Sequence, residues 1–175
     1  MKKPIEDNLH LNVNVLDAYL YYALHSYPMA SHEGDQHMRE STWETNKVLL
    51  RQLFEQAIHR GNLAIVDEIF SNDFLDHSTP GQPAGPQGVK DYFISIRTGF
   101  PDMRVAIDDI IAEGDRVVVR TTWHGTHQGT YEGVPPTGRQ VARTLIQIFR
   151  IRDGRIVDEW NEGGGLLDSV QKDSH

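Results

Sequence analysis

The residues best suited to chemistry lie in the last third of the chain, on two segments that resemble neighbouring strands. Arg143 and Gln147 alternate with apolar residues in one segment, and Glu159 and Asn161 alternate with others in the next. Successive side chains of a strand point to opposite faces, so each pair shares one face. Guanidinium and amide groups donate hydrogen bonds, whereas a carboxylate accepts them and can take a proton. The pattern indicates the wall of a small-molecule pocket.

Three more titratable residues are candidates for acid–base chemistry. Asp76 and His77 follow the apolar pair Phe74-Leu75, where burial would raise the pKa of a carboxylate. Neighbours on an extended segment face opposite ways, so we expect only one of the two to face the pocket. Asp76 could instead form a turn before Pro80. His127 shares a face with Trp123 and could act as a pocket acid or base, or it could fix the loop that follows it.

The remaining candidates each have a structural alternative. Arg143 would bind an anionic ligand group or, more simply, pair with a carboxylate such as Glu159. If Glu159 faces inward it is a second-choice base, while Glu162 falls on the opposite face and is expected in solvent. Phe149 and Trp160 fit core or interface positions.

Two hairpins in series should carry these residues. Asp153-Gly154 lies between IFRI and RIVDEW, which is typical of a type I′ turn because both central residues need positive φ. Glu113-Gly114-Asp115 joins a strand over 101–112 to RVVVRTTWHGTH, whose β-branched residues favour a strand. Both faces of the later strands are mixed, so we expect helices on one face and a second subunit on the other.

Three helices precede the strands. Apolar residues recur at helical spacing from Thr42 until Gly61, Asn62 caps the segment NLAIVDEIF, and Gly85-Pro86 introduces VKDYFISIRTGF. Helices followed by hairpins predict an α+β domain, with the helices on one side of a curved, mainly antiparallel sheet.

Composition limits the kind of protein. The 175 residues suit one full core, and the absence of cysteine excludes disulfide and thiol chemistry and fits a reducing compartment. A net charge of −8 argues against nonspecific binding to nucleic acid or to an anionic membrane. No apolar run is long enough to span a bilayer, and no cleavable signal is evident. We therefore predict a cytoplasmic protein without nucleic-acid or membrane partners.

Residues 1–42 form a separate, partly helical arm and linker in this interpretation. Asn14 could cap a helix that ends at Pro28, and a polar segment follows it. Four histidines lie in this region, but their spacing is wider than zinc sites use, so we predict no metal. They are His10, His25, His32 and His37.

Several motifs together resemble the SnoaL-like polyketide cyclase family of the nuclear transport factor 2-like superfamily. GDRVVVR, GTHQGTYEGVPPTGR and IFRIRDGRIVDEWN carry the resemblance, preceded by DFLDH and GFPDM, and it covers roughly residues 43–170. It implies a cone, or α+β barrel, in which the sheet wraps around helices and encloses a deep apolar pocket. It also implies a homodimer joined across the outer face of the sheet, and a domain over residues 43–175.

The resemblance implies intramolecular aldol condensation without metal or cofactor. In the family a carboxylate on the last strand takes the α-proton, and a polar residue or histidine on the preceding strand holds the developing enolate oxygen. Those positions hold Asn161 and Gln147 here, and neither amide titrates, although both donate hydrogen bonds. The base must therefore lie elsewhere. Since the family usually has histidine at position 77, we favour His77 over Asp76.

We accordingly predict a cofactor-independent protein with a pocket of several hundred cubic ångströms for a small hydrophobic or carbonyl-containing molecule. The first hypothesis is an enzyme that acts by enolisation, aldol closure or isomerisation. The second is a non-catalytic protein that binds or senses the same ligand, and the third is a hydrolase or dehydratase. Predicted catalytic residues are Asn161, Gln147, His77, Asp76 and His127, and predicted substrate-binding residues are Phe54, Trp123, Arg143, Phe149 and Glu159.

Overall fold

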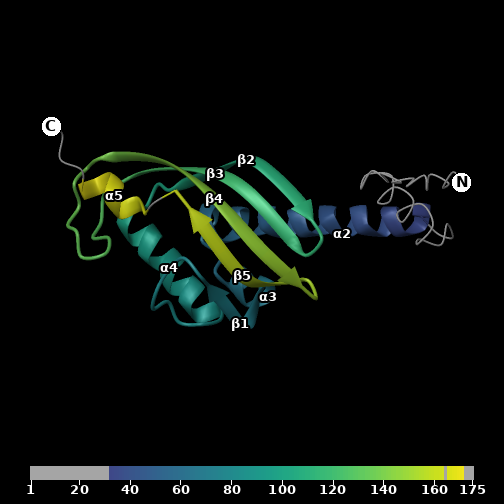
Figure 1. The fold of residues 1–175 in the computed structure, drawn as a ribbon. Helices are drawn as coiled ribbons and strands as arrows, with labels where there is room; N and C mark the ends of the chain where they lie inside the picture. Colours follow the sequence, from purple (N-terminus) through teal and green to yellow (C-terminus); the bar gives the residue numbers. More distant parts are fainter. Residues whose placement is uncertain (1–31, 164, 172–175) are drawn as a thin grey trace, which may run out of the picture. The chain divides into compact units, whose positions relative to one another are not determined.

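The computed structural model describes residues 32–163 and 165–171, and residues from Met38 onward form one compact unit. The helix predicted between Asn14 and Pro28 lies outside the described residues, and the predicted boundary after residue 42 stays a prediction. The elements follow the predicted α+β order with one added strand (Figure 1): α2 (His32–Leu53), η1 (Phe54–His59), α3 (Ala64–Ile69), β1 (Phe70–Asp76), α4 (Pro86–Gly99), β2 (Arg104–Glu113), β3 (Arg116–Thr126), β4 (Gln140–Arg152), β5 (Arg155–Glu162) and α5 (Leu166–Gln171).

The curved sheet has five strands in the order β1-β5-β4-β3-β2. The pairs β2–β3, β3–β4 and β4–β5 are antiparallel, as the two hairpins predict, whereas β1 pairs with β5 in parallel. The sequence pattern predicts a loop at β1, because the segment is short and contains polar turn-forming residues. Its register with β5 also shifts along its length. This strand has a functional consequence, since it sets Asp76 directly beside Glu159.

The hairpin between β4 and β5 confirms the predicted turn, because Asp153 and Gly154 both have positive φ, at 51° and 73°. The register then shifts between Arg150 and Ile151, which leaves Val157 without a partner in the β4–β5 ladder. Regular alternation along β5 would place Ile156 on the same face as Asp158. Ile156 instead pairs with Ile151 and is fully buried, because the extra residue reverses the alternation.

The first helix begins ten residues earlier than expected. Thr42, where the helical spacing begins in the sequence, is an interior residue of α2, and its hydroxyl donates a 2.9 Å hydrogen bond to the Met38 carbonyl one turn back. The described side chains from Met38 to Thr45 are mostly exposed, so this part carries no apolar stripe that a sequence pattern could detect. The helix continues beyond Leu53 as the π-helix η1.

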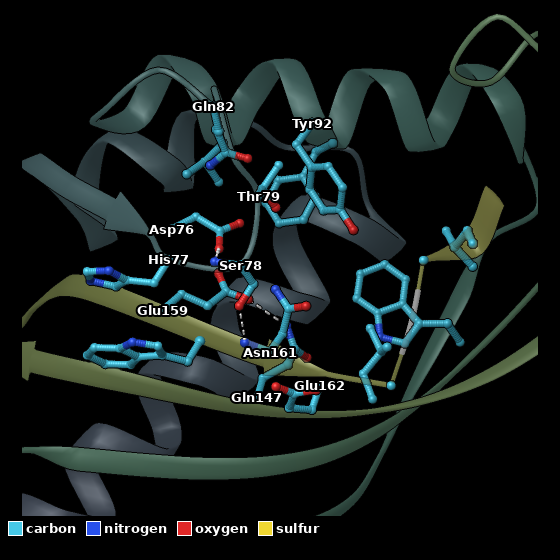
Figure 2. A pocket seen from close by; sticks show the side chains of 18 of the residues that line it. Asp76, His77, Ser78, Thr79, Gln82, Tyr92, Gln147, Glu159, Asn161 and Glu162 are labelled. Atoms are coloured by element: carbon cyan, nitrogen blue, oxygen red, sulfur yellow. Dashed lines mark hydrogen bonds between the residues drawn. The ribbon is translucent and has the colours of Figure 1, made fainter. Parts of the chain in front are cut away.

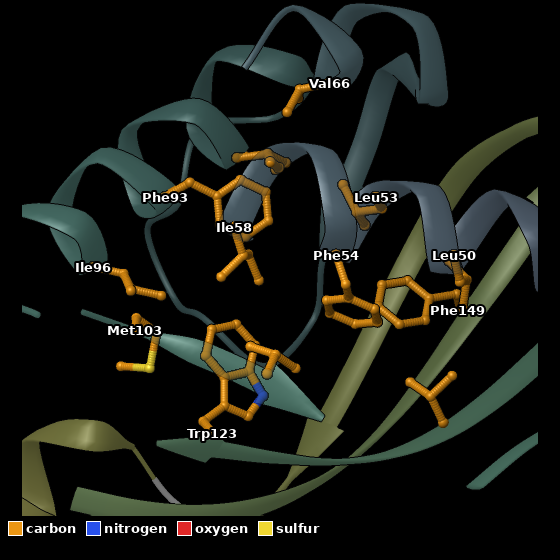
Figure 3. Packing of buried hydrophobic residues seen from close by; sticks show 14 of the residues in the cluster. Leu50, Leu53, Phe54, Ile58, Val66, Phe93, Ile96, Met103, Trp123 and Phe149 are labelled. Atoms are coloured by element: carbon orange, nitrogen blue, oxygen red, sulfur yellow. The ribbon is translucent and has the colours of Figure 1, made fainter. Parts of the chain in front are cut away.

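The hydrophobic core lies between the helices and one face of the sheet (Figure 3). Leu53 and Phe54 lie where the long helix ends, and the Phe54 ring meets the Trp123 ring of β3 edge-on, with centroids 6.4 Å apart. Phe93 and Ile96 of α4 face the same region. Because aromatic side chains pack from both layers, the strand face that carries the predicted site residues is held rigidly.

The other face of the sheet has its own polar anchor, Asp158, whose residue is only 5% exposed. Its carboxylate binds His77 Nε2 at 2.7 Å and accepts a hydrogen bond from Arg150 Nε at 2.7 Å. Burial opposes ionisation, but these hydrogen bonds hold the pKa of Asp158 below its usual value.

We expect Asp158→Asn to lower the free energy of unfolding by about 1–3 kcal/mol at pH 7, because it removes a charged acceptor that His77 and Arg150 share. The depressed pKa stabilises the fold above the ordinary aspartate pKa, and this contribution is lost as pH falls through the folded-state value. Urea denaturation at pH 7 and at low pH should therefore show a difference that shrinks on acidification. Asp153→Asn, in the exposed turn, is the control, and equal losses for both variants would contradict the assignment.

Candidate functional site

A cavity of about 590 Å³ lies between the helices and the concave side of the sheet (Figure 2). Aromatic and aliphatic side chains of the helices line one part of it, and polar side chains of β1, β4 and β5 gather in another. The apolar lining that we expected therefore holds for one side only. Nine of the ten predicted site residues line the cavity: Phe54, Asp76, His77, Trp123, Arg143, Gln147, Phe149, Glu159 and Asn161.

Two carboxylates meet at the polar side of the cavity. Asp76, the last residue of β1, is the parallel-strand partner of Glu159 on β5, and its Oδ1 accepts a 2.8 Å hydrogen bond from the Ser78 N–H. Burial raises the pKa of Glu159 to about 8, and the neighbouring Asp76 charge contributes to the increase, whereas hydrogen bonds from Gln147 and Asn161 oppose the shift. A carboxyl group with this pKa can both take and return a proton near neutral pH.

A chain of hydrogen bonds fixes the orientation of Glu159. Trp123 Nε1 donates to Thr121 Oγ1 at 3.0 Å, Thr121 Oγ1 donates to Gln147 Oε1 at 3.1 Å, and Gln147 Nε2 donates to Glu159 Oε1 at 2.9 Å. An indole N–H is only a donor, so it sets the direction of every later bond and the amide orientation of Gln147. Glu159 Oε1 is thereby an acceptor, and Asn161 also donates a hydrogen bond to the same carboxylate.

Thr121 was not among the predicted residues, although the alternation of β3 places it on the same face as Trp123. It is fully buried, and its hydroxyl is the link between the indole and the amide. Only a structure identifies this role, because threonine in a strand is ordinarily explained by β-propensity alone.

Asn161 lies two residues after Glu159 on β5, and Figure 2 shows its amide at the same side of the cavity as Gln147. Its backbone N–H donates to Ser78 Oγ at 2.7 Å, which ties the segment after β1 to the last strand. Tyr92 on α4 faces the cavity from the opposite side. Burial raises the pKa of the Tyr92 hydroxyl, so it remains a neutral donor.

His77 also borders the cavity, but its imidazole is engaged elsewhere. The ring stacks on Trp160 with centroids 4.6 Å apart and planes within 3°, and Nε2 binds Asp158. Figure 2 shows the His77 ring turned away from Glu159 and Asn161. Asp76, rather than the favoured His77, is the neighbour whose side chain faces Glu159. The reason is the parallel pairing of β1 with β5, which a local pattern does not reveal.

His127 does not line the cavity, so the prediction of a pocket acid or base at this position is wrong. The side chain is fully buried, its Nδ1 lies 3.1 Å from Thr137 Oγ1, and its ring lies 5.1 Å from that of Phe100. The Thr137 N–H donates to the same Nδ1 at 3.3 Å. These contacts match the alternative that we gave for His127, which is to fix the loop after β3.

Arg143 pairs with a different carboxylate from the one we named. Its Nη2 lies 3.5 Å from Asp168 Oδ2 on α5, whereas Glu159 is bound by Gln147. Glu162 is exposed, as predicted, and lies at the rim of the cavity.

The described residues contain no group of three histidine, aspartate or glutamate side chains that could hold a metal ion. Within the same residues, no helix is long and apolar enough to cross a membrane.

Comparisons with known proteins point to one family. Residues 48–163 match the family model of the SnoaL-like polyketide cyclases. Nogalonic acid methyl ester cyclase from Streptomyces nogalater is 28% identical over 117 residues, which are 63% of this chain and 87% of the relative. TsrD from Streptomyces laurentii superposes with a TM-score of 0.67 and 25% identity, covering 73% of this chain and 96% of TsrD. AclR from Streptomyces galilaeus superposes with a TM-score of 0.64 and 28% identity, covering 73% of this chain and 96% of AclR.

Proposed function

Because the chain belongs to the SnoaL-like polyketide cyclase family, we propose that it is an enzyme that closes or isomerises a small carbonyl compound with Glu159 as its base. The observation that carries the proposal is the Glu159 carboxyl group, partly buried at the polar side of the cavity, with a pKa of about 8. Asn161 occupies the position where the family resemblance implies the base, and Glu159 lies two residues earlier on the same strand face. The proton acceptor has thus moved along the strand without leaving the cavity.

The proposed reaction needs no further reagent. Glu159 Oε2 takes the α-proton of a ketone, and the C–H electron pair forms the enolate, whose oxygen accepts hydrogen bonds from Asn161 or Tyr92. The enolate carbon then attacks a second carbonyl carbon of the same molecule, which forms the C–C bond. The resulting alkoxide takes the proton back from Glu159. For isomerisation the substrate is an unsaturated ketone, and the proton returns instead to the γ-carbon of its dienolate.

Asn161 itself favours a second candidate function, a protein that binds or senses a carbonyl compound without converting it. An amide at the position of the family base can donate to a carbonyl oxygen but cannot accept a proton. The two candidates differ in one respect, which is whether Glu159 exchanges protons with a bound ketone.

We also propose that the protein is a homodimer joined across the outer face of the sheet, and that it works in the cytoplasm. Two large apolar side chains on that face support the dimer: Ile111 is 66% exposed and Ile146 is 49% exposed. Burial of such side chains is a common driving force for association. Sedimentation of the purified protein tests the dimer directly.

The enzyme hypothesis predicts a pH dependence. The exchange of the α-protons of 1-tetralone in deuterium oxide, followed by NMR, should accelerate with rising pH and level off above about 8, because only ionised Glu159 accepts a proton. Asp76→Asn should move the midpoint to lower pH, because it removes a negative charge that disfavours ionisation of Glu159.

Asp91→Asn, on the exposed side of α4, is the matched control and should leave the midpoint unchanged. Exchange no faster than in buffer alone would favour the binding protein over the enzyme. A wild-type rate that is independent of pH between 6 and 9 would exclude Glu159 as the base.

A further inference from the structure

Arg143, a positively charged residue that lines the cavity, has a hydrogen-bond donor without an acceptor among the described residues. Among the described residues that line the cavity, Arg143 is the only lysine or arginine. Its side chain is 24% exposed, and its Nε atom is buried without a hydrogen-bond partner among the described residues. Buried donors are nearly always paired in folded proteins, so an unpaired guanidinium nitrogen in a side chain that lines the cavity indicates a site for an acceptor of the ligand.

The ion pair between Arg143 and Asp168 is weak. Asp168 Oδ2 lies 3.5 Å from Nη2, and the Asp168 side chain is 58% exposed, so solvent screens the interaction. Nε and Nη2 form one edge of the guanidinium plane, and this edge matches the two oxygens of a carboxylate. Asp168 contacts one end of that edge and leaves Nε free to donate.

We propose that Arg143 is an anion subsite that binds a carboxylate of the ligand through Nε and Nη2. The proposal rests on the proposed function, because it uses the same cavity, and it adds the charge of the substrate: an acid rather than a neutral ester. The ligand carboxylate replaces or joins Asp168 at the guanidinium edge.

The position of Arg143 also defines the shape of this ligand. Arg143 and Gln147 share a face of β4 and are four residues apart, or about 13 Å along the strand. Gln147 holds Glu159, so the cation and the base contact opposite ends of a ligand. Leu145 lies between them on β4, and Trp123 is the cross-strand partner of Arg143. A flat fused-ring acid, with its carboxylate at one end and an enolisable carbonyl at the other, fits this order.

The other charges at the cavity favour the same orientation. Asp76 and Glu159 lie at the polar side, where they would repel a carboxylate. Glu132 and Glu162 at the rim are exposed, and solvent and salt screen them. The anionic end of a ligand is therefore directed toward Arg143 and its carbonyl end toward Glu159.

The test compares anthraquinone-2-carboxylate with anthraquinone-2-carboxamide, which have nearly the same shape and differ in charge. Isothermal titration calorimetry should show that the wild-type protein binds the carboxylate at least about tenfold more tightly. Arg143→Gln should remove this difference and leave the affinity for the carboxamide within about threefold. Arg143→Lys should keep part of the difference, because it keeps the charge and loses the planar pair of donors. Arg152→Gln, on an exposed part of the same strand, is the control.

A second measurement reports on the nitrogen itself. The 15Nε resonance of Arg143 should shift when the carboxylate is added and not when the carboxamide is added. Equal affinities for the two compounds, or no binding of either below about 1 mM, overturn the anion subsite. Binding requires no proton transfer, so a carboxylate preference in a protein that exchanges no ketone protons supports the subsite and counts against the proposed enzyme. Active exchange with equal affinities overturns the subsite alone.

Discussion

Glu159→Gln is expected to slow α-proton exchange of 1-tetralone by about a hundred- to ten-thousand-fold at pH 8. The variant removes the proton acceptor and keeps the shape of the side chain. The amide oxygen of the introduced glutamine can still accept the hydrogen bond that Gln147 Nε2 donates, so the chain of bonds from Trp123 is preserved. The loss should therefore appear in the chemical step and not in the fold.

The same variant should gain stability, which separates loss of the base from damage to the protein. The pKa of Glu159 is raised from its ordinary value of 4.5 to about 8 in the folded state, so folding becomes less favourable as pH rises between these values. Glutamine carries no charge and avoids this cost. We expect Glu159→Gln to exceed the wild type by about 1–3 kcal/mol in free energy of unfolding above pH 8, and the gain to vanish below pH 4.5.

Glu162→Gln provides the matched control, because Glu162 is an exposed glutamate at the rim of the same cavity. It should change neither the exchange rate nor the pH dependence of stability. If the Glu159→Gln protein exchanges α-protons at the wild-type rate, Glu159 is not the base, whatever the stability of the variant.

The arrangement around Glu159 was only partly predictable. Alternation along two strands joined by the Asp153-Gly154 turn is a local property, and it correctly grouped Gln147, Glu159 and Asn161 on the cavity side. The bulge opposite Arg150 is also local, but no residue type in the sequence marks it, so regular alternation along β5 gives the wrong face for Ile156.

Contacts between distant segments were beyond the reach of these patterns. Ser78 and Asn161 are 83 positions apart, and the parallel pairing that joins their segments depends on how the helices pack the chain back onto the sheet. That pairing decides that Asp76 faces Glu159 and that His77 packs on Trp160. A periodicity states which residues share a face, but it does not state which distant segment will meet them.

The family resemblance predicted the fold correctly, and the base that we propose lies close to the position that the resemblance implies. It directed attention to the last strand, where Asn161 stands in the position of the carboxylate, and from there to His77 in an earlier segment. Glu159, the base that we propose, is two residues away on the same face. A base at either position would project into the same part of the cavity, because residues two apart on a strand point the same way. A carboxylate at position 159 can therefore serve the same part of the cavity as a carboxylate at position 161.

Because positions 159 and 161 share a face, we expect a carboxylate at position 161 to rescue the loss of the one at position 159. In the Glu159→Gln background, Asn161→Asp should restore α-proton exchange by at least about a hundredfold, because it places a carboxylate on the same cavity wall. Asp76 also lines the cavity, and its negative charge should raise the pKa of the new acid above the ordinary aspartate value. The pH profile should accordingly return with a different midpoint.

The control for this rescue is Thr144→Asp in the same background, which adds an aspartate to β4 on the exposed face. It should restore nothing. If Asn161→Asp also restores nothing in a folded protein, positions 159 and 161 do not act on the same ligand atom, and the displaced-base account of this cavity fails. If it restores exchange, Asn161 in the natural chain is best understood as a hydrogen-bond donor to the enolate oxygen, because the two roles of the family site have been divided between two neighbouring residues.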